Sequence, residues 1–267
     1  MLRARVLTAL FLLGLTLAAI YLLPQWAFAT VMGAVVLGCG WEWSRLAGLE
    51  SSVARGAAVG LLALAMLGAA NNPDAMFVVL VCASALWLLA TVFVLRYPRD
   101  ARWLSGPWVG LLGLPLLVGA WAGLCAIRSG PNGGHWLLWL FCLVWAADVG
   151  AYFSGRRFGR RKLAPAVSPG KTWEGVVGGA LLSLAVTWVL LATAGHASPA
   201  WVAVVLGLIA LSIFGDLFES VLKRQRGVKD SGSLLPGHGG LLDRVDALLP
   251  VLPVFALLQP LLQQAPA

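Results

Sequence analysis

The sequence has very little charge. Only 11% of its 267 residues are Asp, Glu, Lys or Arg, whereas soluble domains carry about 25%. Hydrophobic residues make up 60% of the chain, above the value of roughly 45–50% typical of soluble domains. These figures exclude the soluble globular, disordered and fibrous classes and predict an integral membrane protein.

Cysteine is also scarce. The four cysteines stand in apolar runs without any CxxC pair, which argues against a disulfide framework or a zinc site. We interpret them as small buried hydrophobic residues. They are Cys39, Cys82, Cys125 and Cys142.

Apolar runs long enough to cross a bilayer recur along the whole chain. A spanning helix needs about 20 mostly apolar residues, and nine such segments can be drawn. They are 6–23, 26–44, 54–70, 76–95, 107–127, 135–153, 174–195, 199–222 and 245–263. Breaks between them coincide with Pro24, Asn71-Asn72-Pro73, Tyr97-Pro98, Pro131–Gly134 and Ser198-Pro199. The sequence therefore predicts an all-α polytopic membrane protein with about nine transmembrane helices.

The N-terminal run could also be a signal peptide. Arg3 and Arg5 precede it, and Ala27-Phe28-Ala29 resembles a cleavage site. The run from Val6 to Leu23 exceeds the usual h-region of about 7–15 residues. We therefore expect an uncleaved first helix. We divide the chain into N-terminal transmembrane helices at 1–130 and a C-terminal catalytic region at 131–267.

The basic residues predict the orientation of these helices. Lys and Arg concentrate in the cytoplasmic loops of membrane proteins. If the N-terminus is cytoplasmic, every Lys and Arg except Arg128 falls on the cytoplasmic side. The net charge of +8 thus follows from topology, and we expect no nucleic-acid partner.

Two cytoplasmic loops, 154–173 and 223–244, are longer and more polar than the others. Acidic residues inside spanning segments are costly and usually mark a functional site. Seven of the eleven acidic residues lie in these loops or in the flanking helix ends: Asp148, Glu174, Asp216, Glu219, Asp230, Asp243 and Asp246. We expect the chemistry to take place where the two loops meet.

Helical spacing groups several of these acids. Asp216, Glu219 and Lys223 recur on one face at the end of the eighth segment, together with Ser220, and Asp243 and Asp246 are three residues apart at the start of the ninth. Two helix ends could aim three carboxylates at one point, which suits a hard cation such as Mg²⁺. The alternative is a set of interhelical salt bridges with Lys223, Arg224 and Arg244.

Two short motifs allow both a functional and a purely structural interpretation. Gly170-Lys171-Thr172 resembles the end of a P-loop, but Pro165 stands where that motif needs glycine. We reject the P-loop and keep Lys171 and Thr172 as contacts for an anionic ligand. Pro236–Gly240 could cradle phosphate oxygens or simply form a turn. His238 within it could be an acid–base group, a phosphate donor or a structural hydrogen-bonding residue.

The residue order then resembles a known family. The segments that carry the resemblance are Ser220-x-Leu222-Lys223-Arg224, Lys229-Asp230-x-Gly232 and Leu235-Pro236-x-His238-Gly239-Gly240-Leu241-x-Asp243-Arg244-x-Asp246. They are similar to the signature of the bacterial phosphatidate cytidylyltransferase (CDP-diacylglycerol synthase) family. Asp148–Tyr152, Gly155–Gly159 and Ser168–Gly175 are similar to further family segments. The resemblance covers about 145–260.

The resemblance implies a reaction in which CTP and phosphatidate give CDP-diacylglycerol and pyrophosphate. It further implies a Mg²⁺ requirement, with a second cation possible, a multi-pass position in the bacterial inner membrane with the site facing the cytoplasm, and a possible homodimer. It assigns the metal to Asp216, Asp243 and Asp246, and catalysis to these residues with Lys223, Lys229 and His238. Substrate binding falls to Asp148, Ser168, Lys171, Thr172, Ser220, Arg224, Asp230, Gly239, Gly240 and Arg244.

Two alternatives stay open. One is a related membrane enzyme, a CDP-lipid synthase or a lipid kinase, acting on another lipid. The other is an ion-coupled transporter, which would need polar residues along several helices from one membrane face to the other. The acids gather at the cytoplasmic end instead, which argues against transport.

Overall fold

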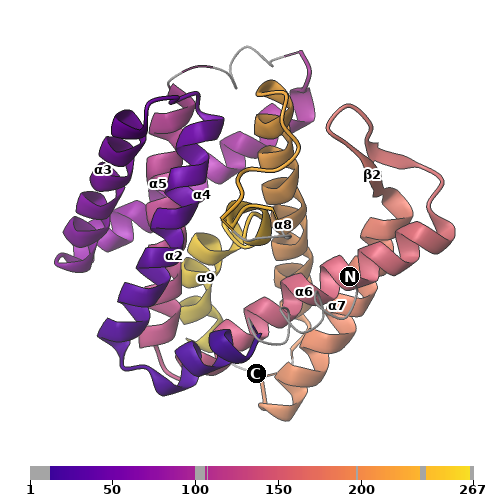
Figure 1. Ribbon diagram of the computed structural model, residues 1–267. Coiled ribbons are helices and arrows are strands. Elements are labelled where there is room, and N and C mark those ends of the chain that lie inside the picture. Colours follow the sequence, from indigo (N-terminus) through magenta and orange to yellow (C-terminus); the bar gives the residue numbers. More distant parts are fainter. Residues whose placement is uncertain (1–12, 100–105, 107, 197, 235–238, 265–267) are drawn as a thin grey trace.

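The computed structural model describes residues 13–99, 106, 108–196, 198–234 and 239–264. Within these ranges the chain is mainly helical, as expected, and one short two-stranded hairpin interrupts the helices (Figure 1). The helices are α2 (Gln25–Leu46), α3 (Ser52–Ala70), α4 (Pro73–Arg96), α5 (Trp108–Ser129), α6 (Gly133–Phe158), α7 (Trp173–Thr193), α8 (Ala200–Gln225) and α9 (Val251–Gln264). A 3₁₀ turn, η2, covers Leu242–Arg244.

Six helices are long and apolar enough to cross a membrane: α3, α4, α5, α6, α7 and α8. The predicted multi-pass membrane fold is therefore confirmed. Of the other three predicted segments, 26–44 lies within α2, whereas the described apolar helices at Leu13–Leu22 and Val251–Leu262 are shorter than the segments 6–23 and 245–263. Residues 6–12 lie outside the described residues. The count of nine spans stays a prediction.

The predicted break points fall at helix boundaries. Pro24 stands before α2, and Pro199 stands before α8. Asn72 caps α4, because its side chain accepts hydrogen bonds from the N–H groups of Asp74 and Ala75 at 2.9 and 3.2 Å. Pro73 occupies the first turn, where its missing N–H is harmless.

The start of the last helix was predicted wrongly. We expected a helix from 245, whereas α9 begins at Val251 and residues 245–250 form turns. Pro250 explains the difference, since proline disfavours helical geometry in the residue before it and suits the start of a helix. Asp243 lies in η2 and Asp246 in the turns.

Helix α5 lies at the centre of the N-terminal helices. It packs against α2, α3, α4, α6 and α9. Two tryptophans tie it to α2: Trp43 Nε1 donates to the Val109 carbonyl at 2.8 Å, and Trp121 Nε1 donates to the Ala29 carbonyl at 2.9 Å. Each bond satisfies the one polar atom of a large buried ring.

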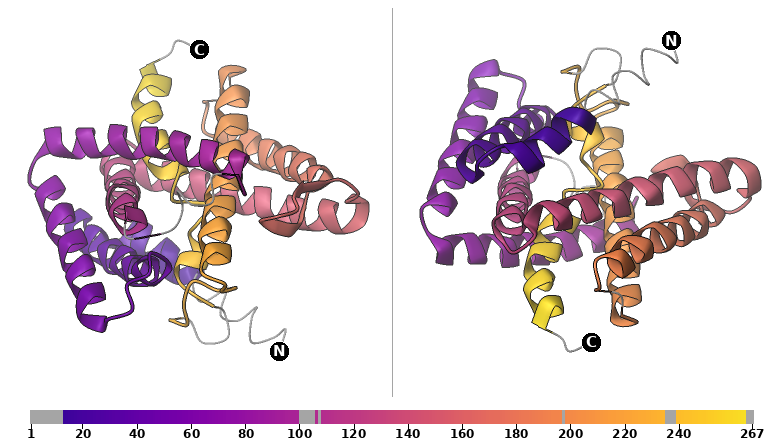
Figure 2. Two further views of the ribbon diagram at one scale, coloured as in Figure 1. Left: turned by 90° about the horizontal axis from the view of Figure 1, so that it is seen from above. Right: turned by 90° about the horizontal axis from the view of Figure 1, so that it is seen from below.

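Helices α6 and α7 form a closely packed pair that extends away from this group (Figure 2). Ser183 Oγ of α7 donates to the Leu143 carbonyl of α6 at 2.8 Å. The chain between the two helices forms strands β1 (Lys162–Ala164) and β2 (Ser168–Thr172), which pair antiparallel. The predicted loop 154–173 is thus the end of α6 followed by a hairpin.

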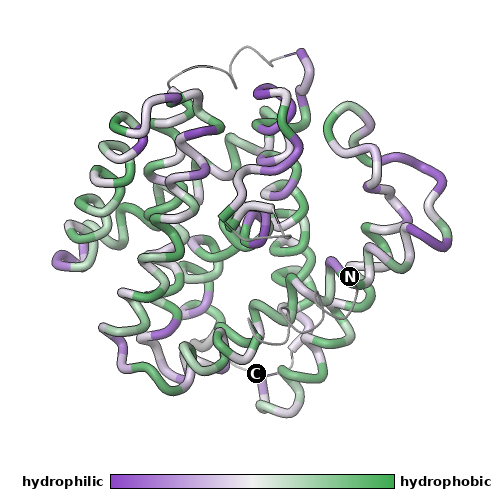
Figure 3. Tube along the Cα trace, in the orientation of Figure 1, coloured by the Kyte–Doolittle hydropathy of each residue, from purple (hydrophilic) through white to green (hydrophobic). Residues whose placement is uncertain are grey.

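Helix α8 stands between the two groups and contacts α4, α6, α7 and α9. Gly215 lets the turns after η2 approach it, because a Cβ there would lie 2.5 Å from the Asp246 carbonyl oxygen and 2.7 Å from Pro250 Cγ. This approach brings Asp246 beside Asp216. Figure 3 shows hydrophilic segments in the hairpin and around the C-terminal end of α8, whereas the helices are mostly hydrophobic.

Candidate active site

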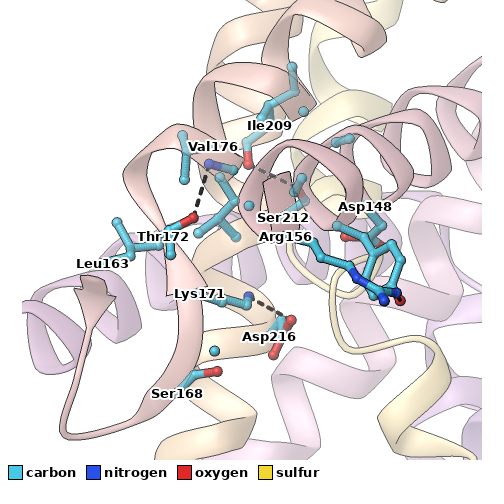
Figure 4. Close-up of a pocket in the computed structure, with 18 residues that line it drawn as sticks. Asp148, Arg156, Leu163, Ser168, Lys171, Thr172, Val176, Ile209, Ser212 and Asp216 are labelled. Atoms are coloured by element: carbon cyan, nitrogen blue, oxygen red, sulfur yellow. Dashed lines mark hydrogen bonds and ion pairs between the residues drawn. The ribbon is translucent and has the colours of Figure 1, made fainter. Parts of the chain in front are cut away.

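A cavity of about 480 Å³ lies between α6, the hairpin, α7 and α8 (Figure 4). Its lining includes five residues that the sequence singled out: Asp148, Ser168, Lys171, Thr172 and Asp216. The cavity therefore joins residues of the first polar loop to the helix that leads into the second.

The ion pair between Lys171 and Asp216 connects these two parts. Lys171 Nζ lies 2.6 Å from Asp216 Oδ2, and Figure 4 shows the two side chains pointing toward each other from β2 and α8. Ser220 Oγ donates to the other carboxylate oxygen at 3.3 Å. Arg224 adds a second link, because its Nε donates to the Val167 carbonyl at 3.2 Å.

Two residues near the hairpin have clear structural roles. Thr172 Oγ1 accepts a hydrogen bond from the Gly175 N–H at 3.1 Å and so caps α7. The Glu174 carboxylate accepts the N–H groups of Arg160 and Arg161 at 3.0–3.2 Å. The first turn of α7 thereby fixes the base of the hairpin that carries Lys171.

A second cluster surrounds Lys223. Its Nζ lies 2.5 Å from Glu219 Oε2 and 2.6 Å from Asp243 Oδ1. The three side chains are 12%, 3% and 11% exposed. A salt bridge between the two segments, the predicted alternative, is therefore observed for Lys223 and Asp243, whereas the pair of Lys223 and Glu219 lies within α8.

Asp243 is held by several donors. Its Oδ2 accepts from the N–H of Gly240 at 2.8 Å and from the N–H and hydroxyl of Ser231 at 3.0 and 2.9 Å. Burial alone would raise the pKa of this carboxyl group. The hydrogen bonds from Lys223, Gly240 and Ser231 outweigh burial and lower the pKa below its usual value. Asp243 is therefore a carboxylate at neutral pH.

Three acids lie close to one another where α8 meets the turns after η2. Asp246 interacts electrostatically with both Asp216 and Glu219. Among the residues that the structure describes, no group of three or more His, Cys, Asp or Glu side chains could hold a metal ion. Mg²⁺ is usually bound by one or two carboxylates plus substrate phosphates and water. The carboxylate oxygens of Asp216 and Asp243 fit that mode of binding. The magnesium site itself stays a prediction.

The remaining predicted residues are spread around these clusters. Lys229 and Asp230 are exposed. Gly239 lies beside Asp230 and Asp243, and its φ of +80° suits glycine. The Gly240 N–H donates to Asp243. Arg244 belongs to η2, and His238 lies outside the described residues.

The sequence interpretation missed Glu42, which is buried on α2 and bonded to the loop that holds Asp243. Its signal was present, because it is an acid inside a predicted spanning segment, the criterion that marked Asp216. Arg156 is a further cavity residue that was not among the predicted site residues. It lines the cavity and donates to the Tyr152 hydroxyl at 3.0 Å.

Comparison with known proteins gives consistent matches. Residues 3–262 match a sequence model described as "Cytidylyltransferase family". A phosphatidate cytidylyltransferase of Pseudomonas aeruginosa is 46% identical over 262 residues, which cover 97% of each chain. The enzyme of the same name from Haemophilus influenzae is 38% identical over 281 residues, covering 96% of this chain and 98% of that one. One from Brucella melitensis is 42% identical over 184 residues, covering 61% and 67% of the two chains.

Proposed function

The chain belongs to the cytidylyltransferase family, and we propose that it transfers the cytidylyl group of CTP to phosphatidate. In this reaction a phosphate oxygen of phosphatidate forms a bond to the α-phosphorus of CTP. The bond from that phosphorus to the β-phosphate oxygen breaks, and pyrophosphate leaves with the bonding electrons. The products are CDP-diacylglycerol, used in phospholipid biosynthesis, and pyrophosphate.

The observation that carries the proposal is the ion pair between Lys171 and Asp216 inside the cavity. The two side chains are 27% and 31% exposed, so a solute can reach them. The lining also includes apolar groups from four elements, among them Leu163, Val176 and Ile213. A cavity lined by both polar and apolar groups is suited to an anionic nucleotide that must meet a lipid.

The chain's own groups would supply alignment and charge neutralisation, which dominate catalysis of phosphoryl transfer. The attacking phosphate is already anionic near neutral pH, so the reaction needs no dedicated protein base. We assign Lys171, Arg156 and Arg224 to the phosphates, because they stand in or beside the cavity. Lys223, Lys229 and Arg244, with the Gly239 amide and His238, would extend this positive region along the second loop.

Asp216 and Asp243, with Asp246 beside them, would hold a magnesium ion that arrives with CTP. When bound, the ion would neutralise the phosphate oxygens on which negative charge develops. The carboxylates of Asp216 and Asp243 each have a lysine partner within 2.6 Å. Lys171, which is partly exposed, would contact the phosphates of the nucleotide, whereas the more buried Lys223 would stay beside Asp243 and keep its orientation.

We infer that the site faces the cytoplasm of a bacterial inner membrane and that the N-terminus is cytoplasmic. The distribution of Lys and Arg supports this orientation, since Arg128 is the one basic residue assigned to the opposite side. Arg128 lies in the last turn of α5, where its Nε donates to the Ile20 carbonyl at 2.7 Å. Cytoplasmic CTP would reach the cavity from water, and phosphatidate from the leaflet. A homodimer is a further expectation from the family resemblance.

The reaction can be tested with purified protein, phosphatidate, Mg²⁺ and CTP labelled at either the α- or the γ-phosphate. We expect the α-label in the lipid and the γ-label in pyrophosphate. A lipid kinase would put the γ-label in the lipid and leave the α-label in CDP. Folded protein that labels no lipid with either form of CTP would overturn the proposal.

Replacing Lys171 by Met should separate function from stability. Partly exposed ion pairs contribute about 0–1 kcal/mol, so the thermal stability of the variant in detergent should stay close to that of the wild type. Loss of a preorganised positive group at the phosphates should lower kcat/KM for CTP by about 10²-fold. Lys162→Met, which changes an exposed lysine of the same hairpin, is the matched control. Equal activity of the two variants would contradict the assignment of Lys171.

A further inference from the structure

Glu42 connects the N-terminal helices to the loop that carries Asp243. The side chain comes from α2, and the residue is only 1% exposed. Its Oε2 accepts a hydrogen bond from the Leu242 N–H at 2.8 Å and lies 3.1 Å from the oxygen of the Ser231 hydroxyl, which donates its one proton to Asp243. These partners lie 200 and 189 residues further along the chain. One buried carboxyl group therefore contacts two described segments, 231–234 and 239–242, of the chain that leads to Asp243.

Two glycines form the niche that receives this carboxyl group. A Cβ at Gly232 would lie 2.1 Å from Glu42 Oε1, and one at Gly240 would lie 2.5 Å from Oε2. Contacts under 3.0 Å essentially never occur at a real Cβ. A side chain at Gly232 or Gly240 would therefore force the Glu42 carboxyl group to move from its present position.

The same loop residues fix Asp243. Ser231 Oγ lies between the two carboxyl groups, 3.1 Å from Glu42 Oε2 and 2.9 Å from Asp243 Oδ2. The N–H groups of Ser231 and Gly240 donate to Asp243, and Leu242 precedes it in the chain. Any shift of the loop away from Glu42 must therefore move the donors that orient Asp243.

Burial of Oε1, the second carboxyl oxygen of Glu42, lowers the stability of the folded protein. Oε1 is buried and has no hydrogen-bond partner among the residues that the structure describes. An unsatisfied buried polar atom is destabilising. The tie between α2 and the loop is maintained in spite of this penalty, as is common at functional sites.

We propose that Glu42 is a positioning residue for Asp243. It holds Leu242 and Ser231, and through them it sets the place of the Asp243 carboxylate opposite Lys223. The inference deepens the proposed function and rests on it where turnover is concerned. It also assigns a role in the catalytic site to a helix of the N-terminal half.

Turnover of Glu42→Ala and Glu42→Gln tests the effect on catalysis. A small misplacement of a group that aligns the reaction can lower the rate by about 10²-fold, so we expect that loss in kcat for Glu42→Ala, with KM for CTP nearly unchanged. Glu42→Gln keeps an acceptor for the Leu242 N–H and should recover most of the loss. Glu50→Gln, which changes an exposed acid just after α2, is the control and should match the wild type. A folded Glu42→Ala protein with wild-type kcat would overturn the positioning role.

A double-mutant cycle between Glu42→Ala and Gly232→Ala tests the contact without any turnover. The three atoms nearest to a Cβ at Gly232 all belong to Glu42. Gly232→Ala should therefore lower the melting temperature in detergent much more when Glu42 is present than when residue 42 is alanine. Hydrogen exchange at Ser231, Gly240 and Leu242 should accelerate in Glu42→Ala and not in Glu50→Gln.

The two measurements keep the inference and the proposed function separate. If wild-type protein makes no CDP-lipid, the proposed function fails, and the cycle still reports whether Glu42 docks the loop. If the two substitutions are additive and hydrogen exchange is unchanged, the docking role is wrong whatever the activity.

Discussion

Asparagine in place of Asp216 or of Asp243 is expected to lower cytidylyl transfer by about 10³-fold, the larger of the losses typical for removing one preorganised electrostatic group from an active site. Asparagine is nearly isosteric with aspartate and keeps one carbonyl oxygen. At Asp216 the expected loss therefore mainly reports the negative charge, whereas at Asp243 it also includes the loss of hydrogen bonds.

We expect this loss for Asp216→Asn because the Asp216 side chain contacts the hairpin and α8 and also lines the cavity. Its carboxylate faces Lys171 of the hairpin, accepts a hydrogen bond from Ser220 and lines the cavity. Removing its charge would leave Lys171 without its counter-charge and would take away a predicted metal ligand. Both effects act on the phosphates of the nucleotide.

We expect a similar loss of activity for Asp243→Asn, but for a different reason. Lys223, Gly240 and Ser231 all donate to this carboxylate, which lowers its pKa and fixes its orientation. A group so well ordered before substrate binds needs little reorganisation during the reaction. Asparagine at this position would place an NH₂ group among donors, and the local order would be lost.

The measurement is incorporation of the α-label of CTP into lipid at saturating substrates, with expression and thermal stability recorded for each variant. Asp74→Asn changes an exposed acid in the first turn of α4 and serves as the control. Apparent half-saturation by Mg²⁺ should rise for both site variants and not for the control. Substantial activity in folded Asp216→Asn and Asp243→Asn proteins would contradict the metal and catalytic assignments.

The helices were largely predictable from the sequence because their signals are local. Apolar runs of about 20 residues set the spans, and prolines such as Pro24, Pro73 and Pro199 set the boundaries. The one clear error, at α9, also has a local cause. The apolar run begins near Val245, but Pro250 delays the helix to Val251.

The site was only partly predictable because its contacts are tertiary. Helical spacing places Glu219 and Lys223 together, and they do pair. No local pattern shows that Lys171 meets Asp216 or that Glu42 reaches Leu242, because these pairs are 45 and 200 residues apart in the chain. Burial of acids in apolar segments was the usable signal, and applying it to the N-terminal half as well would have found Glu42.

Replacing Lys223 by Met should produce the largest loss of stability among the substitutions considered. Lys223 is the cation between Glu219 and Asp243, and all three side chains are at most 12% exposed. Removing one partner of a buried ion pair leaves an uncompensated charge and is destabilising by about 3–5 kcal/mol. Here two carboxylates, those of Glu219 and Asp243, lose their common partner.

Thermal unfolding in detergent measures this effect, with Lys162→Met as the matched control for loss of one exposed positive charge. The double variant Lys223→Met/Glu219→Gln should be more stable than Lys223→Met, because one of the two stranded charges is gone. Turnover should not recover with stability, since Lys223 also orients Asp243. If Lys223→Met unfolds at the same temperature as Lys162→Met, the buried cluster does not stabilise the junction between α8 and η2.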